Sequence, residues 1–523
     1  MRKRYNSLLI ITTILSLIAF GACTPKKNAD NTQSQKGTWP NAVTYEIFVQ
    51  SFCDSDGNGI GDFKGLTSKL PYIEELGVEA IWLMPIMPSP SYHKYDVTNY
   101  KAVHPDYGSL EDFREMLDEA HKRGVKVVVD FIINHTSKNH HWFKEASKGK
   151  DNPYRDYYVW KSLEEIKKQG NLTKESQADS DNKVQWYEVE DNSNQRYYGY
   201  FGSNMPDLNF DNPKVRKAIF EIGQYWLKDI GVDGFRLDAA KHIFDESPEK
   251  SHAFWVEFRK AMESVKPDVY LVGEVWADAK TVAPYLEGLP SLFNFDMGYA
   301  ITDVCRNGAD NGIVEKYKNI HDFYVSVTPD FIDATFITNH DQERIMSALN
   351  NDISKAKMAA NLLMTFPGAP YVYYGEEIGM RGKKPDEYIR EPFPWQKDGK
   401  GTPKWIKPKY TLSNTVAPAS EQESDKNSML NHYRALIHTR SKNKVLTFGE
   451  IKPVDFGSKE VVSFYRMHDS DTLMVIHNVS ANELKLSNNL GEFKRQVFST
   501  GKSISVENGD IQLSPYSTWI FSK

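Results

Sequence analysis

The chain has 523 residues, of which 40% are hydrophobic and 26% charged, and its formal net charge is −6. This apolar content is too high for a disordered protein and too low for a polytopic membrane protein. Acidic residues (70) outnumber basic ones (64), so the composition carries no sign of nucleic-acid binding. Three cysteines exclude a disulfide-stapled scaffold. The length predicts more than one domain, unless a large α/β barrel is present.

The N-terminus has the pattern of an export signal. Basic residues 2–4 precede an apolar run over 8–20, which is too short to span a membrane comfortably. The run ends in Phe-Gly-Ala before Cys23, which resembles the lipobox of bacterial lipoproteins, with Phe in place of the usual Leu. An ordinary secretory signal is the alternative. We expect a signal peptide over 1–22, a lipid on Cys23 and a flexible tether over 23–38. The protein would then be secreted and attached to the bacterial cell envelope only through this lipid.

Short β-type runs alternate with helical patterns from residue 42 onwards, which is typical of βα units around a parallel sheet. Eight such runs match the strand number of a TIM barrel. The predicted fold class is α/β: a (β/α)8 TIM barrel with a small inserted domain after strand 3 and a C-terminal antiparallel β-sandwich. The strands are expected at 42–49, 79–86, 125–130, 234–238, 269–274, 291–295, 333–338 and 370–374.

Other local signals place the remaining parts. Asn212 as a cap and Pro213 as the first residue predict a helix whose apolar face carries Val215, Ile219, Ile222 and Trp226. The runs 461–467 and 472–479, joined by four polar residues, predict a β-hairpin. The expected domains are the barrel in two parts over 39–135 and 213–443, the inserted domain over 136–212, and the C-terminal sandwich over 444–523.

Carboxylates stand where the predicted strands end. Asp130, Asp238 and Glu274 end strands, and Asp341 lies just beyond one. In a barrel these ends converge on the face where chemistry takes place. The sequence shows neither a Cys/His metal cluster nor a Gly-rich phosphate loop beside these acids. Several acids alone favour cleavage of a glycosidic bond. That reaction needs one carboxylate at the anomeric carbon and one protonated carboxyl at the leaving oxygen. A helix cap or salt bridge would explain any one of them, but not all four.

The segments around these acids are similar to the four main motifs of the α-amylase family, glycoside hydrolase family 13. They are 130–135 (DFIINH), 234–242 (GFRLDAAKH), 273–276 (GEVW) and 336–341 (FITNHD). The resemblance extends from residue 42 to the C-terminus. It implies that Asp238 is a nucleophile forming a covalent glycosyl-enzyme, Glu274 the general acid/base and Asp341 a stabiliser of the transition state. The Asp238 and Glu274 carboxyls should then lie ~5–5.5 Å apart, and the anomeric configuration should be retained.

The same resemblance implies substrate-binding residues. Arg236, on the strand face of Asp238, would keep that carboxylate ionised. Lys241 and His242 would lie on the leaving-group side of the cleaved bond. The other expected contacts are His135 and His340 to sugar hydroxyls, Tyr95 as a stacking ring with its neighbour Asp96, and Arg390 closing the same subsite.

Residues 54–62 (DSDGNGIGD) place oxygen ligands at alternate positions around a glycine. This resembles the first half of an EF-hand loop, but Gly65 stands at the twelfth position, where an EF-hand has Glu. A metal-free acidic turn is the alternative. We expect Ca²⁺ as a cofactor, held by the side chains of Asp54, Asp56, Asn58 and Asp62 and by the Ile60 carbonyl, with a second ion at Asn134 as a property of the family.

The fifth motif of the family resembles 205–209 (MPDLN), and Met205 there points away from oligo-1,6-glucosidases, which usually carry Gln. The resemblance therefore implies an α-amylase, intermediate between oligo-1,6-glucosidases and neopullulanases, that cleaves internal α-1,4 bonds of starch and maltodextrins. We also expect a monomer. Two alternatives remain: a maltogenic, neopullulanase-like or transglycosylating relative, and a non-catalytic membrane-anchored barrel, against which the retained acids count. Cys53 and Cys305 are expected as buried thiols, a disulfide being the alternative.

Overall fold

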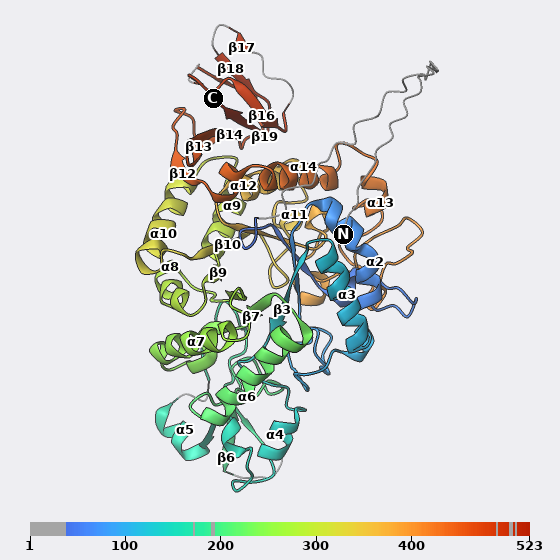
Figure 1. The fold of residues 1–523 in the computed structure, drawn as a ribbon, viewed down its shortest axis with the longest axis vertical. Coiled ribbons are helices and arrows are strands. Elements are labelled where there is room, and N and C mark those ends of the chain that lie inside the picture. The colour runs from blue at the N-terminus through green and yellow to red at the C-terminus, as the bar shows by residue number, and fades with distance from the viewer. Residues whose placement is uncertain (1–37, 171–172, 190–193, 488–489, 502–505, 508–509) are drawn as a thin grey trace, which may run out of the picture. The chain divides into compact units, whose positions relative to one another are not determined.

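A computed structural model describes residues 38–170, 173–189, 194–487, 490–501, 506–507 and 510–523 (Figure 1). The predicted signal peptide, Cys23 and all of the tether except Thr38 lie outside these residues. Within them, no helix has both the length and the apolar character needed to cross a membrane.

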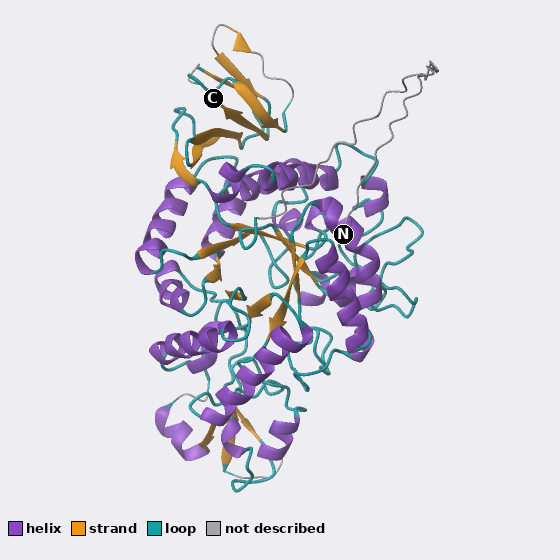
Figure 2. Ribbon diagram, in the orientation of Figure 1, coloured by secondary structure: helices purple, strands orange, loops and turns teal. Residues whose placement is uncertain are grey.

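Eight parallel strands close into a barrel in the order β1-β11-β10-β9-β8-β7-β3-β2, and helices surround it (Figure 2). This confirms the predicted fold class, and every expected strand is present, its ends moved by no more than three residues. Their residues are almost all buried, as expected for a sheet covered on both faces. The strands are β1 Thr44–Ile47, β2 Ala80–Leu83, β3 Lys126–Phe131, β7 Gly234–Leu237, β8 Tyr270–Gly273, β9 Ser291–Phe293, β10 Ile332–Phe336 and β11 Ala369–Tyr373.

The helices pack apolar faces against the barrel, as α6 (Pro213–Gln224) illustrates. The Asn212 side chain accepts a hydrogen bond from the Lys214 N–H, and Val215, Ile219 and Ile222 are buried, as predicted. Trp226 is buried in the helical turn that follows. The other long helices are α2 Phe63–Leu76, α3 Leu110–Lys122, α7 Pro248–Glu263, α9 Phe295–Asn307, α10 Ile313–Val327, α12 Ile353–Thr365 and α14 Met429–Ser441; short ones are α1 Val49–Phe52, α8 Ala279–Val282, α11 Ile345–Ala348, α13 Ala419–Gln422 and α15 Lys444–Phe448.

The segment between β3 and β7 carries its own antiparallel sheet of order β4-β6-β5. Aromatic side chains form its interior, where Phe143 and Trp160 stack with ring centroids 5.9 Å apart. The boundaries 136 and 212, like the other domain limits, stay predictions. The elements are α4 His141–Ala146, β4 Trp160–Ser162, α5 Leu163–Gln169, β5 Trp186–Glu188 and β6 Gln195–Tyr198.

The C-terminal part holds two antiparallel sheets, of orders β12-β13-β14-β19-β16 and β15-β18-β17. The predicted hairpin is confirmed as β13 and β14. Phe464 of β13 contacts Phe366 after α12, with ring centroids 5.0 Å apart, so this part shares a core with the barrel. The strands are β12 Glu450–Pro453, β13 Val461–His468, β14 Asp471–Asn478, β15 Leu484–Leu486, β16 Arg495–Ser499, β17 Val506–Glu507, β18 Asp510–Leu513 and β19 Ser517–Ser522.

The two cysteines of the described residues, Cys53 and Cys305, are free thiols and buried. This agrees with the expected buried thiols and excludes a disulfide between them. Burial raises the pKa of both, which keeps them protonated and unreactive.

Candidate active site

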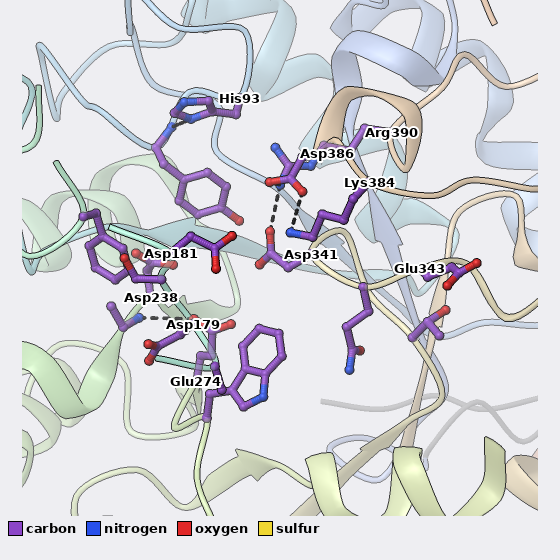
Figure 3. A pocket seen from close by; sticks show the side chains of 18 of the residues that line it. His93, Asp179, Asp181, Asp238, Glu274, Asp341, Glu343, Lys384, Asp386 and Arg390 are labelled. Carbon is purple, nitrogen blue, oxygen red and sulfur yellow. Dashed lines mark hydrogen bonds and ion pairs between the residues drawn. The ribbon is translucent and has the colours of Figure 1, made fainter. Parts of the chain in front are cut away.

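The predicted acids meet at the C-terminal ends of neighbouring barrel strands. The register pairs Asp130 of β3 with Arg236 of β7, and Leu237 of β7 with Gly273 of β8. The residues that follow, Asp238 and Glu274, are therefore neighbours. Both line a cleft of about 640 Å³, shown in Figure 3, which also contains Asp341 and Arg390.

The backbone after β7 is shaped to present Asp238 beside Glu274. Ala239 has φ 48° and ψ 41°, in the left-handed region that side-chain-bearing residues rarely adopt. Its N–H lies 3.4 Å from Glu274 Oε2, and the Ala240 N–H donates to the Glu274 carbonyl at 3.0 Å. Glycine is needed before Glu274, because a Cβ at Gly273 would lie 2.5 Å from Leu289. Strained backbone of this kind concentrates at functional sites.

One buried guanidinium binds three acids, two of which line the cleft. Arg236 Nη1 donates to Asp130 Oδ1 at 2.9 Å and to Asp238 Oδ1 at 2.6 Å, and its Nη2 lies 2.9 Å from Glu274 Oε2. The Arg236 side chain is 1% exposed. Burial alone would lower the pKa of Arg236, but the surrounding carboxylates hold it well above its usual value. Arg236 thus makes the contact expected of a residue that keeps Asp238 ionised.

Two of these carboxyls have a raised pKa. Burial raises the pKa of Glu274 to about 7, with the charge of Arg236 opposing and that of Asp238 adding to the shift. Glu274 can therefore carry a proton near neutral pH, as a general acid must. Burial also raises the pKa of Asp130 to about 7, but Asp130 is fully buried, so its contacts are with Arg236 and the Tyr95 hydroxyl.

Asp341 lies on the other side of the cleft with two cations. Arg390 Nη2 donates to Asp341 Oδ1 at 2.7 Å, and His340 Nε2 lies 3.0 Å from Asp341 Oδ2 and 2.6 Å from the Tyr95 hydroxyl. Burial opposes the charge of both members of the pair. The charges of Asp341 and Glu46 nevertheless raise the pKa of His340 to about 10, and His340 holds the pKa of Asp341 well below its usual range. Asp341 is therefore an anion and His340 a cation.

Glu46 is a site residue that the sequence analysis missed. It lies within β1, is 1% exposed and has its Oε1 2.6 Å from His340 Nδ1. A charged residue in the middle of the apolar run 42–49 was a visible signal. That signal shows only that a polar partner is needed, not that it is His340.

The other expected binding residues divide into two groups. His135 and Tyr95 line the cleft with Arg390. Asp96 is 3% exposed and lies outside the cleft lining, where Ser89 donates to it at 2.6 Å. His242 is also buried, with both ring nitrogens bound to carboxylates, at 2.5 Å from Asp245 and 2.9 Å from Asp179. Asp179, from the segment between β3 and β7, is the second site residue that the sequence analysis missed, and it lines the cleft.

The acidic loop forms a cluster of oxygen atoms. One carboxylate oxygen each of Asp54, Asp56 and Asp62 lies within 4.8 Å of the others. Asp62 also accepts a hydrogen bond from the Gly65 N–H, and so caps α2. In the described part of the chain, this is the one group of three or more acidic, histidine or cysteine side chains close enough to share an ion.

Asn134 has a less suitable environment for a metal ion. Its Nδ2 donates to Asp207 at 3.2 Å, and burial raises the pKa of Asp207 to about 8, which leaves that carboxyl neutral at pH 7. A neutral carboxyl is a poor ligand for a hard cation. The second ion at Asn134 therefore gains no support here and stays a prediction.

Known protein families and relatives match most of this chain. The profile described as "Alpha amylase, catalytic domain" matches residues 46–449, and "Alpha-amylase SusG C-terminal domain" matches 461–520. Alpha-amylase 3 of Dictyoglomus thermophilum is 42% identical over 484 residues, covering 92% of this chain and 93% of its own. A 4-alpha-glucanotransferase of Thermotoga neapolitana is 35% identical over 454 residues, covering 84% and 96%. The crystal structure of an alpha-amylase from H. orenii has a TM-score of 0.85 at 43% identity, covering 92% and 99%.

Proposed function

The chain belongs to the α-amylase family, glycoside hydrolase family 13, and is a glycosidase of the α-amylase type; we propose that it cleaves internal α-1,4-glucosidic bonds of starch and maltodextrins and retains the anomeric configuration. The observation that carries this proposal is the arrangement around Arg236. One buried guanidinium binds Asp238 and also Glu274, whose pKa burial raises to about 7. An anionic nucleophile and a protonated acid are what retaining cleavage needs.

The reaction follows from these positions. Asp238 attacks the anomeric carbon while Glu274 gives its proton to the leaving oxygen, so that the glycosidic bond breaks and a glycosyl ester forms on Asp238. Glu274 then takes a proton from water, whose oxygen attacks the same carbon and releases Asp238 as a carboxylate. The anionic Asp341, held by Arg390, binds hydroxyls of the sugar and stabilises positive charge at the ring.

The nucleophile is tested by Asp238→Asn. The amide keeps the size of the carboxylate but cannot attack, so turnover should fall to less than about a hundredth of wild type while the far-UV spectrum and melting temperature stay close to wild type. A folded variant with more activity than that would remove Asp238 from this role.

The substrate class is tested by chromatography of the products from starch, pullulan, isomaltose and maltotriose. Endo-cleavage should give mixed maltooligosaccharides from starch, and the first products should keep the α configuration by NMR. A preference for pullulan or isomaltose would overturn the α-1,4 assignment.

Transfer to a sugar acceptor is the second candidate reaction. It uses the same acids, because a sugar hydroxyl can replace water at the glycosyl-enzyme, and the relative from Thermotoga neapolitana is named a glucanotransferase. Incubation with concentrated maltotriose separates the two reactions. Products longer than the substrate indicate transfer, whereas glucose and maltose alone indicate hydrolysis.

We also propose Ca²⁺ in the loop over 54–62. Three carboxylates within 4.8 Å of one another suit a hard cation, and the Ile60 carbonyl and Asn58 would complete the ligand set. The Asn58 side-chain oxygen accepts a hydrogen bond from the Ile60 N–H at 2.8 Å. An amide oxygen has a second lone pair, so Asn58 could bind an ion and keep this hydrogen bond. The ion would be structural, since the loop joins α1 to α2.

The place of the enzyme at the cell envelope rests on the sequence around Cys23 alone. We propose a lipid anchor there, which presents the enzyme to external glucans. Expression of Cys23→Ser in the native host should move the protein from the membrane fraction to the soluble fraction. If variant and wild type divide equally between the two fractions, Cys23 carries no anchor and the N-terminus is an ordinary secretory signal.

A further inference from the structure

A turn of the inserted segment reaches the active-site cleft. Gln177 and Ser180 pair through their backbones, and a bridge between Thr173 and Val184 closes the base of this loop. Asp179 stands at the tip. It lines the cleft together with Asp238 and Glu274, as Figure 3 shows.

The carboxylate of Asp179 binds two cationic side chains that follow the nucleophile. Lys241 Nζ lies 2.7 Å from Asp179 Oδ2, and His242 Nε2 lies 2.9 Å from the same oxygen. The Tyr200 hydroxyl donates to Asp179 Oδ1 at 3.2 Å. The Asp179 side chain is only 10% exposed, so solvent screens these charges little.

Lys241 and His242 differ in what they can still bind. Both ring nitrogens of His242 are bound, to Asp179 and Asp245, and so neither remains for a sugar. The Lys241 ammonium has three N–H groups, of which one is used by Asp179 and one by the Trp276 carbonyl at 3.1 Å. Lys241 therefore keeps one donor for a ligand, in a position that Asp179 and Trp276 determine.

Two partners of this network, Asp179 and Trp276, line the cleft together with Glu274, and Lys241 contacts both of them. Glu274 protonates the leaving oxygen, and Trp276 follows it by two residues in the cleft wall. Phe295 covers one face of the Trp276 indole at 4.6 Å, which leaves the other face for a ligand, and Tyr299 beside it is 47% exposed. Figure 3 shows Asp341 and Arg390 apart from Glu274 and Asp179.

We propose that Asp179 is a specificity-determining residue: it positions Lys241 for the sugar on the leaving-group side, and so sets how well the enzyme uses a sugar as leaving group or acceptor. The inference rests on the proposed glycosidase function. Asp179 is a positioning residue in this scheme, because it acts through Lys241. Cleavage of a substrate whose leaving group is not a sugar should not depend on Asp179.

The test compares two substrates that share a glycosyl part and differ in the leaving group: maltopentaose and 2-chloro-4-nitrophenyl maltotrioside. In Asp179→Asn, kcat/KM for maltopentaose should fall by about tenfold, mainly through KM, because a positioned charge-assisted hydrogen bond is lost. Release of chloronitrophenol should change by less than about twofold. The matched control is Glu175→Gln, a charge change at an exposed position of the same loop, which should alter neither.

A double-mutant cycle tests the route through Lys241. Lys241→Met should lower kcat/KM for maltopentaose about as much as Asp179→Asn does, and the double variant should lower it little further. Fully additive losses, an equal loss on both substrates, or no loss in Asp179→Asn would each overturn the inference. If wild type hydrolyses neither substrate, the proposed function fails instead.

Discussion

The Arg236 guanidinium cannot neutralise all the carboxyls that it binds. Asp130, Asp238 and Glu274 each contact it, and all four side chains are less than 10% exposed. Three anions around one buried cation would leave uncompensated charge, which is costly in a low dielectric. Retaining a proton relieves that cost, and Glu274, whose pKa lies at about 7, is the carboxyl facing the leaving group that can do so. The burial that raises the pKa of Glu274 thus supports the proposal that this residue is the acid.

The pH dependence of activity should report this proton. Glu274 donates only when protonated, so kcat/KM for maltopentaose should fall as pH rises through about 7, the pKa to which burial raises it. Initial rates across this range in a constant-ionic-strength buffer measure it. Glu274→Gln, which has no proton to lose there, should retain a small activity without this basic limb. A wild-type profile that is flat through this range would contradict the assignment.

Glu46 should matter although no substrate reaches it. Glu46→Gln removes one of two anions beside the His340 imidazolium, so the pKa of His340 should fall towards its ordinary value. The ion pair between His340 and Asp341 would weaken. Because a hydrogen bond to a charged group contributes enough free energy for a tenfold effect or more, kcat/KM should drop by about tenfold or more. NMR titration of His340 with steady-state kinetics measures both effects. An unchanged His340 titration would show that Glu46 is not its charge partner.

At the scale of elements, the ends of strands and helices do the chemical positioning. The turn after β7 carries Asp238 and the strained Ala239, and the loop before α2 carries the acidic cluster. Asp62 serves that cluster and also caps α2, so an ion there would be tied to the position of a barrel helix. Asp56, by contrast, is exposed and caps no helix.

Removal of calcium should therefore destabilise the enzyme. Free Ca²⁺ at about 100 times its Kd adds ~2.7 kcal/mol to the free energy of unfolding. Dialysis against a chelator should therefore lower the melting temperature by several degrees, and added Ca²⁺ should restore it. Asp56→Asn should melt close to wild type in chelator but gain less from Ca²⁺. Calorimetry of both proteins in Ca²⁺ and in chelator measures this. Equal melting of wild type in the two buffers would refute the site.

At the scale of the whole molecule, one face of the five-stranded C-terminal sheet joins the core of the barrel, while its other face forms a separate cluster with the three-stranded sheet. Phe464, Val475 and Ile520 belong to the same buried cluster as the barrel helices. Arg466 of β13, which is fully buried, also donates to the carbonyl of Thr365 at the end of α12. The two parts should therefore unfold together rather than one by one.

Phe464→Ala tests this coupling. Truncating a buried phenylalanine costs about 3–5 kcal/mol, so the melting temperature should fall while the transition stays single. At a temperature where the variant is folded, kcat should equal that of wild type, because Phe464 does not line the cleft. Scanning calorimetry with activity assays measures both. Two separate transitions, with only one of them shifted, would show independent domains.

Local sequence patterns determined much of this protein. The apolar runs that became barrel strands, and the acids at their ends, could be read from the sequence, because burial on both sides of a parallel strand demands continuous hydrophobicity. Asn212 and Pro213 were similarly readable, since capping is a property of adjacent residues. The sequence thereby located Asp238, Glu274 and Asp341 at one end of a barrel.

Tertiary structure alone decided which partners these residues have. Glu46 and His340 are 294 residues apart, and Asp179 and His242 are 63 apart, so no local pattern links either pair. In the closed barrel only β11 separates β1 from β10, so that His340 after β10 reaches Glu46 of β1, and the inserted segment places Asp179 against His242 in the turn after β7. Periodicity reports whether a residue is buried, but its charge state depends on the groups that chain closure places beside it, because the field of a charge acts through space.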